Sequence, residues 1–112
     1  MDGLYTYKAH VTAVYDGDTI TCDIDLGCSM WLRGEKIRLL GINAPEVRGS
    51  EREQGIQARD ALRQQILGKE VMLMTHKDKR GKYGRYLGVV IRDGVVMNDW
   101  MVENGFAEIY HP

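Results

Sequence analysis

The chain has 112 residues and a mass of 12.7 kDa, which suffices for one core but not two, so we expect a single domain over residues 1–112. Hydrophobic residues make up 44% and charged residues 28%, which excludes disordered, collagen-like and disulfide-scaffold proteins. The formal net charge of −1 does not predict a protein that coats nucleic acid by bulk charge. With no membrane-length apolar run and no secretory signal, we expect an intracellular protein, or a secreted one if a leader has been removed.

The first half of the chain predicts strands. Tyr5–Val14 is rich in Tyr, Thr and Val and reads as a strand, and Asp16-Gly17-Asp18 makes a turn. Thr19–Leu26 alternates between polar and apolar residues, which is typical of a half-buried strand. We expect a loop over Gly27–Gly34 and a third strand over Glu35–Ile42.

The second half adds helices and two further strands. Helical periodicity over Ser50–Leu67 predicts a long helix that begins with a capping box. Strands are expected at Val71–Thr75 and Tyr86–Arg92, and a short helix at Asn98–Asn104. This order predicts a mainly β protein with helices, folded as a five-stranded Greek-key barrel of the OB type. An SH3-like barrel is the alternative.

The two cysteines do not indicate a zinc site, because such a site needs four ligands. Cys22 lies on the apolar face of its strand and is expected to be a small core residue. A disulfide between Cys22 and Cys28 is the alternative.

Charged residues stand at two unusual places in the first half. Asp16 and Asp18 flank a glycine, so their carboxylates could hold a hard cation, although the same residues also make an ordinary turn. Arg38 lies within an apolar strand, where a guanidinium needs a partner, either a core carboxylate or a bound anion. Pro45 stiffens the turn that carries Glu46, whose alternative role is a solvated loop charge.

A third segment is basic within a neutral protein. Asp78 is its one acid among five cations: Lys77, Lys79, Arg80, Lys82 and Arg85. Two glycines and an interleaved tyrosine suit close contact with a phosphate and a base or ribose. This pattern favours a focused anion site, and a solvated basic loop is the alternative.

Together these residue types suit the hydrolysis of phosphodiesters. The reaction builds negative charge on phosphorus, which guanidinium groups and a divalent cation can stabilise. A carboxylate can take the proton of the attacking water or hold that water in line. The parts are supplied by Asp18, Arg38, Glu46 and Arg85.

Three segments, in this order and spacing, resemble the signature of the staphylococcal nuclease (thermonuclease-like) family: Asp16–Thr19, Ile37–Glu46 and Lys82–Arg85. The resemblance extends over Lys8–Tyr110. It implies an OB-fold barrel and calcium-dependent cleavage of DNA or RNA.

The resemblance also implies individual roles. Phosphate would be bound by Arg38 and Arg85, and Glu46 would activate or orient the attacking water. The cation would be held by Asp18, Asn43 and the backbone oxygen of Ala44, with Asp16 beside it. Lys82 and Tyr83 would lie near the phosphate of the nucleotide.

Two departures from the family pattern modify these expectations. Asn43 stands where the family usually has a second aspartate, so we expect weaker calcium binding and allow other divalent cations. The family's C-terminal helix does not follow within this sequence, so either a monomer or a dimer is compatible with it.

Two functions other than hydrolysis stay open. A catalytically silent OB-fold module could bind single-stranded nucleic acid, and Asn43 supports that interpretation. A barrel that binds a small molecule or a protein would require Arg38 and Arg85 to be structural ion pairs.

Overall fold

The computed structural model describes residues 5–77 and 86–111. Its long strands are β1 (Thr6–Asp16), β2 (Thr19–Gly27), β3 (Met30–Leu39), β5 (Glu70–Lys77) and β6 (Tyr86–Arg92). Its helical elements are the 3₁₀ turn η2 (Gly49–Glu51) and the helices α1 (Arg52–Ile66) and α2 (Met97–Glu103). The short strands are β4 (Ile42–Asn43), β7 (Val95–Val96) and β8 (Glu108–Ile109).

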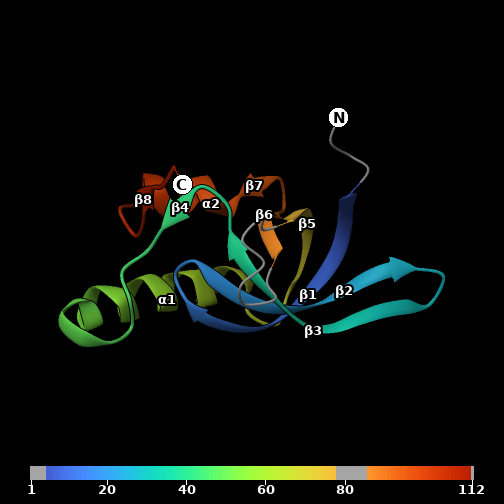
Figure 1. Ribbon diagram of the computed structural model, residues 1–112, viewed down its shortest axis with the longest axis horizontal. Helices are drawn as coiled ribbons and strands as arrows, with labels where there is room; N and C mark the ends of the chain where they lie inside the picture. Colours follow the sequence, from blue (N-terminus) through green and yellow to red (C-terminus); the bar gives the residue numbers. More distant parts are fainter. Residues whose placement is uncertain (1–4, 78–85, 112) are drawn as a thin grey trace.

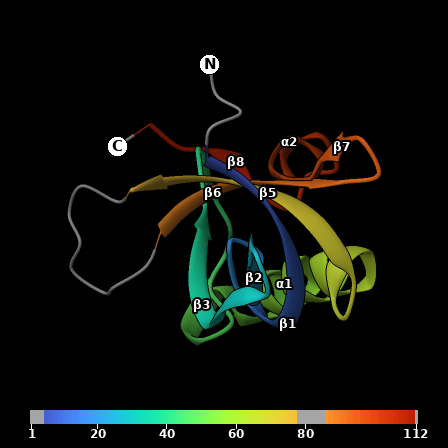
Figure 2. The ribbon, with the colours of Figure 1, turned by 90° about the vertical axis from the view of Figure 1, so that its right-hand side faces the viewer.

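The long strands close into a barrel. They follow the order β3-β2-β1-β5-β6, with antiparallel neighbours, and β7 continues from β6. The barrel closes where β3 also pairs in parallel with β6, from Ile37 opposite Tyr86 to Leu39 opposite Gly88 (Figure 2). The predicted five-stranded barrel of the OB type is therefore confirmed, and the SH3-like alternative is set aside.

The helices and the hairpins occupy different parts of the barrel. Helix α1 lies beside the turn from β1 to β2, whereas the β2–β3 hairpin projects at the opposite end of the molecule (Figure 1). In the described residues the helices have 15 and 7 residues, and neither is long and apolar enough to span a membrane. The turn beside α1 is the one that carries Asp16 and Asp18.

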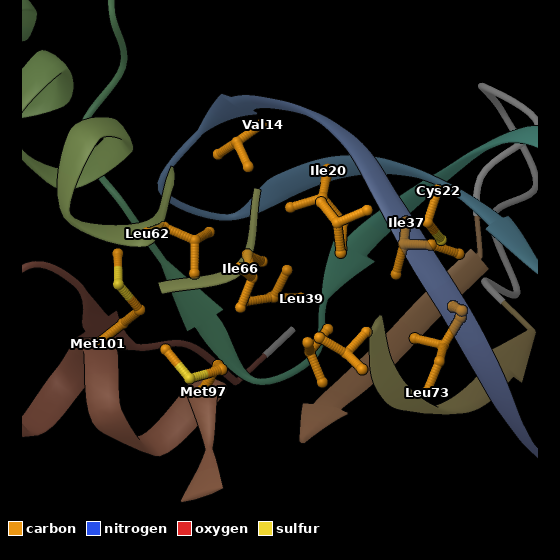
Figure 3. Close-up of a cluster of buried hydrophobic side chains, with 14 of the residues drawn as sticks. Val14, Ile20, Cys22, Ile37, Leu39, Leu62, Ile66, Leu73, Met97 and Met101 are labelled. Atoms are coloured by element: carbon orange, nitrogen blue, oxygen red, sulfur yellow. The ribbon is translucent and has the colours of Figure 1, made fainter. Parts of the chain in front are cut away.

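The core forms where the barrel interior meets both helices (Figure 3). Its largest side chains, all below 2% exposed, include Ile20, Ile37, Leu39, Leu62, Ile66, Met97 and Met101. Truncating one such side chain to alanine typically costs about 2–5 kcal/mol, because the transfer energy is lost and a cavity is left. This packing fixes α1 and α2 against the strands that carry the charged segments.

The predicted alternation in β2 is observed. Ile20, Cys22 and Ile24 are buried, while Thr19 and Thr21 are half-buried. Cys22 is the expected core residue, and burial raises the pKa of its thiol to about 12. The disulfide alternative is wrong, because both cysteines are free and Cys28 is exposed.

The expected loop over Gly27–Gly34 is wrong. The chain makes a tight turn in which Cys28 and Ser29 have φ angles of 54° and 62°, and β3 already begins at Met30. Both faces of this hairpin end are exposed, so the residues lack the apolar alternation that marks a strand. The third strand also ends earlier than expected, at Leu39, before the separate strand β4.

The start of the long helix also differs from the prediction. Ser50 lies inside the 3₁₀ turn, and α1 begins at Arg52 with Glu51 as N-cap and no side-chain cap hydrogen bond. The capping box of Ser50 with Glu53 is therefore wrong. The short helix is confirmed within one residue at each end.

A buried asparagine ties α2 to the barrel. Asn98 Nδ2 donates to the carbonyl oxygens of Leu40 (2.9 Å) and Gly88 (3.0 Å), and Asn98 Oδ1 accepts the N–H of Val90 (3.0 Å). Leu40 N–H in turn donates to Gly88 O at 2.8 Å. One amide thus joins α2, the end of β3 and β6 at the place where the barrel closes.

We expect Asn98→Ala to lower the free energy of unfolding by about 3 kcal/mol, because it leaves buried backbone groups of Val90 and Leu40 without partners. Urea denaturation followed by circular dichroism measures this loss. Asn104→Ala is the control, since its exposed side chain donates to Trp100 O within the same helix and does not bridge elements. Equal losses in both variants would contradict the bridging role of Asn98.

Candidate functional site

An open cleft of about 750 Å³ lies between the barrel wall and the last turn of helix α1, which contributes Arg63. It is lined from β1, β2, β3, α1 and the segment that follows β4. Among its lining residues are six that the sequence singled out: Asp16, Asp18, Arg38, Asn43, Ala44 and Glu46. The other three, Lys82, Tyr83 and Arg85, lie outside the described residues.

Asp18 is held by contacts from three parts of the chain. Its Oδ2 accepts the backbone N–H of Ala44 at 2.8 Å, and its Oδ1 accepts the hydroxyl of Thr19 at 3.0 Å. Its backbone carbonyl accepts the N–H of Leu39 at 2.8 Å. With a side chain only 8% exposed, Asp18 is a fixed negative charge at the base of the cleft.

Arg38 leaves the barrel wall toward this charge. Ile37 and Leu39 point into the core, so Arg38 between them takes the opposite face of β3. Its Nη1 lies 3.1 Å from Asp18 Oδ2, and its Nη2 donates to Asn43 Oδ1 at 3.1 Å. Either a core carboxylate or a bound anion is expected from the sequence as the partner of Arg38. The contact seen here is the first of these, an ion pair with Asp18.

The contact satisfies Arg38 only in part. Nη1 is buried and close to Asp18, yet it makes no well-directed hydrogen bond. A buried donor without such a bond is costly, and a correctly placed anion oxygen would satisfy it. Asp18 thus attracts the guanidinium but leaves Nη1 free to donate a hydrogen bond to another acceptor.

Asp16 stands beside Asp18 across the turn. Its Oδ1 accepts the backbone N–H of Asp18 at 3.1 Å. Burial, followed by the hydrogen bond and the charge of the Asp18 carboxylate, raises the pKa of Asp16 to about 7. The two carboxylates repel each other when both are charged. A divalent cation bound beside them would offset this repulsion.

The oxygen chemistry of the cleft fits a hard cation such as Ca²⁺. Available donors are the carboxylates of Asp16 and Asp18, the amide oxygen of Asn43 and nearby backbone carbonyls. In the described residues, no three His, Cys, Asp or Glu side chains gather into a metal-binding group. A cation here would therefore complete its shell with amide, carbonyl or water oxygens.

Glu46 lines the same cleft with an exposed side chain. Its backbone N–H lies 3.4 Å from Glu51 Oε1, a long hydrogen bond to the residue that caps α1. The segment 44–46 is thereby held at one end by Asp18 and at the other by Glu51. The structure leaves the Glu46 carboxylate in contact with solvent within the cleft.

Two glycines allow the segments of the site to meet: Gly17, in the Asp16–Asp18 turn, and Gly55, which the sequence analysis did not single out. A Cβ on Gly17 would lie 2.8 Å from Ala44 Cβ and 2.9 Å from Ala58 Cβ. A Cβ on Gly55 would lie within 1.9 Å of the carbonyl oxygen of Glu46. The sequence signal for the second contact is a glycine inside the predicted helix, where glycine is unfavourable without a packing reason.

Comparison with known proteins identifies relatives of this chain. The profile of the family described as "Staphylococcal nuclease homologue" matches residues 36–112. That range contains the end of β3, with Arg38, and the segment with Glu46, whereas the Asp16–Asp18 turn precedes it.

Three curated proteins show similarity to the chain. An uncharacterised protein of Bacillus anthracis is 32% identical over 97% of this chain and 50% of its own length. The thermonuclease of Staphylococcus hyicus is 30% identical over 96% of this chain and 62% of its own length. A probable staphylococcal-like nuclease, CAN1, of Oryza sativa subsp. japonica is 36% identical over 67% of this chain and 21% of its own length. The chain thus spans less than two thirds of each of these relatives.

We expect Gly55→Ala to lower the free energy of unfolding by about 1–3 kcal/mol, because the new Cβ meets the Glu46 carbonyl. Without that contact, alanine in a helix would stabilise by about 0.5–1 kcal/mol. Urea denaturation shows whether the free energy of unfolding falls or rises in Gly55→Ala. Gln57→Ala, on the exposed face of α1, is the control. A stabilised Gly55→Ala variant would show that the close approach does not constrain the loop.

Proposed function

Because this chain belongs to the staphylococcal nuclease homologue family, we propose that it is a calcium-dependent phosphodiesterase that cleaves DNA or RNA. The observation that carries the proposal is the convergence of paired carboxylates, a guanidinium and a glutamate on one open cleft. Each part comes from a different element, so no local turn or helix requires them to meet.

Arg38 is the proposed phosphate ligand among the described residues. Its planar guanidinium can donate two parallel hydrogen bonds to phosphate oxygens, and Nη1 lacks a well-directed partner. By resemblance, Arg85 would supply a second guanidinium, and Lys82 and Tyr83 would flank the nucleotide.

Glu46 is the proposed base or orienting group for water. Its exposed carboxylate can accept the proton of a water molecule as the water oxygen bonds to phosphorus and one phosphorus–oxygen bond breaks. The hydrogen bonds that hold segment 44–46 fix the position of Glu46. This matters because a displacement of a catalytic group by about 1 Å can lower the rate about 100-fold.

The proposed oxygen ligands of the cation are Asp18, Asn43 and the Ala44 carbonyl. Asp16 would lie beside the cation without binding it directly. When bound, the cation would neutralise negative charge that develops on the phosphate. Asp18 and Asn43 also contact Arg38, so the same two side chains set the position of the phosphate-binding group.

A silent binding module is the second candidate. Two observations favour it: Asn43 supplies an amide where an aspartate is usual, and Arg38 is already engaged by Asp18 and Asn43. A protein of this kind would bind oligonucleotides without turnover at high calcium concentration.

Cleavage of a labelled oligonucleotide, with Ca²⁺ and with a chelator, tests the proposal. We expect wild-type cleavage that the chelator abolishes, and a loss of about 100- to 10,000-fold in Glu46→Gln, because the group that accepts the proton is removed. Glu53→Gln, an exposed change of the same charge on α1, is the control and should keep full activity. Binding without any cleavage would instead establish the silent module.

Asn43→Asp should lower the Ca²⁺ concentration needed for half-maximal cleavage by about tenfold, because it restores one negative charge to the ligand set. Isothermal titration calorimetry with Ca²⁺ alone provides a readout that does not depend on activity. Asn104→Asp adds the same charge on the exposed end of α2. If the two variants bind Ca²⁺ equally, the assignment of Asn43 is wrong.

A further inference from the structure

We propose that the cleft contains a second phosphate-binding position, formed by Lys36 of β3 and Arg63 of α1, next to the position at Arg38. It would take the adjoining phosphate of a nucleic acid strand. The inference rests on the proposed function for the identity of the strand, but its geometry depends on two residues that this function does not use.

The register of the sheet sets the two positions side by side. Thr19 pairs with both Asp16 and Arg38, which makes a row across β1, β2 and β3. Thr21 pairs with both Ala13 and Lys36, which makes the next row on the same face. Both rows line the cleft.

Lys36 therefore repeats the placement of Arg38. The two residues are separated only by buried Ile37, so they emerge from the same face of β3 about 7 Å apart. That separation is comparable to the distance between successive phosphates in an extended strand. Lys36 is exposed, and within residues 5–77 and 86–111 no carboxylate pairs with it.

Arg63 of α1 lines the same cleft on the β1 side of the sheet, two strands away from Lys36 on β3. Its Nε donates to the carbonyl of Val14 at 3.2 Å, which anchors the guanidinium at the edge of the cleft. Its Nη1 is 3.9 Å from Asp60 Oδ1, whereas Arg59 lies 3.1 Å from the same oxygen. Arg63 is thus positioned by a neutral carbonyl and is only weakly neutralised by Asp60.

The cleft surface between Lys36 and Arg63 suits the backbone of a nucleic acid strand. Ala13 is small and exposed, so the row leaves open space, and the hydroxyl of Thr21 adds a polar group beside it. The row beyond is different, because Asp23 accepts the N–H of Gly34 and pairs with Arg33 at 3.1 Å. The Asp23 carboxylate would repel a further phosphate. We therefore expect no third phosphate-binding position beyond the one at Lys36 and Arg63.

Oligonucleotide binding in the presence of a chelator tests the second position without requiring cleavage. The probes are fluorescent thymidylate and uridylate tetramers, with thymidine 5′-monophosphate as a competitor that carries one phosphate. The variant is Lys36→Met, and Lys69→Met is the charge-matched control, since Lys69 is exposed outside the cleft. We expect Lys36→Met to weaken binding of both tetramers by about fivefold.

Salt dependence separates a phosphate contact from a structural effect. In Lys36→Met the slope of log affinity against log salt should become shallower by about 0.7, the value for one contact with a single strand. Affinity for the monophosphate should be unchanged, because it needs only the position at Arg38. Arg63→Met should weaken tetramer binding as Lys36→Met does, and Arg63→Lys should recover part of the loss.

The outcomes are distinguishable from those that test the proposed function. Tetramer binding that is equal in Lys36→Met and Lys69→Met would overturn the second position, even if the wild type cleaves. A Lys36-dependent loss in a protein that never cleaves would support it while the proposed hydrolysis fails. A loss with only one of the two tetramers would also overturn it, because the contact would then be to sugar or base.

Discussion

The site depends on the carboxylate of Asp18. It joins segments that are far apart in the sequence, because it accepts hydrogen bonds from Thr19 and Ala44 and attracts Arg38. Its own backbone carbonyl binds Leu39 and so ties the β1–β2 turn to β3. A charge buried to this degree is tolerated only where such partners surround it. The partners that make Asp18 acceptable to the fold are thus the residues that the proposed chemistry needs.

The backbone must approach closely for these contacts to form. Gly17 lets the turn rest on Ala44 and Ala58, and Gly55 lets α1 contact the carbonyl of Glu46. Helix α1 lies beside the β1–β2 turn of the barrel (Figure 1). The rigid core beneath, shared by α1 and α2, keeps this approach in place (Figure 3). Small residues at these two positions let the backbone segments approach closely, so that their polar groups can form hydrogen bonds.

How far the sequence predicts this arrangement depends on the kind of signal. Thr19–Leu26 has one buried face, so its alternation predicts a strand, whereas the hairpin around Cys28 is exposed on both faces and carries no such pattern. The motif residues indicate a common site, but the contact of Arg38 with Asp18 follows from a register that only folding establishes. Arg63 appears in the sequence as one more charge on a helix, and its place in the cleft depends on how α1 docks.

Asn43 illustrates why one substitution has two physical consequences. An amide in place of a carboxylate removes one negative charge from a cation's ligands, which weakens cation binding. The same amide still accepts a hydrogen bond from Arg38 but does not neutralise it, so Asp18 is the one carboxylate within salt-bridge distance of this guanidinium in the described residues. The positive field of Arg38 toward the cleft is therefore stronger than it would be between two aspartates. In the site that we propose, Asn43 thus shifts the balance from binding the cation toward binding the phosphate, and the proposed contacts of Lys36 and Arg63 shift it in the same direction.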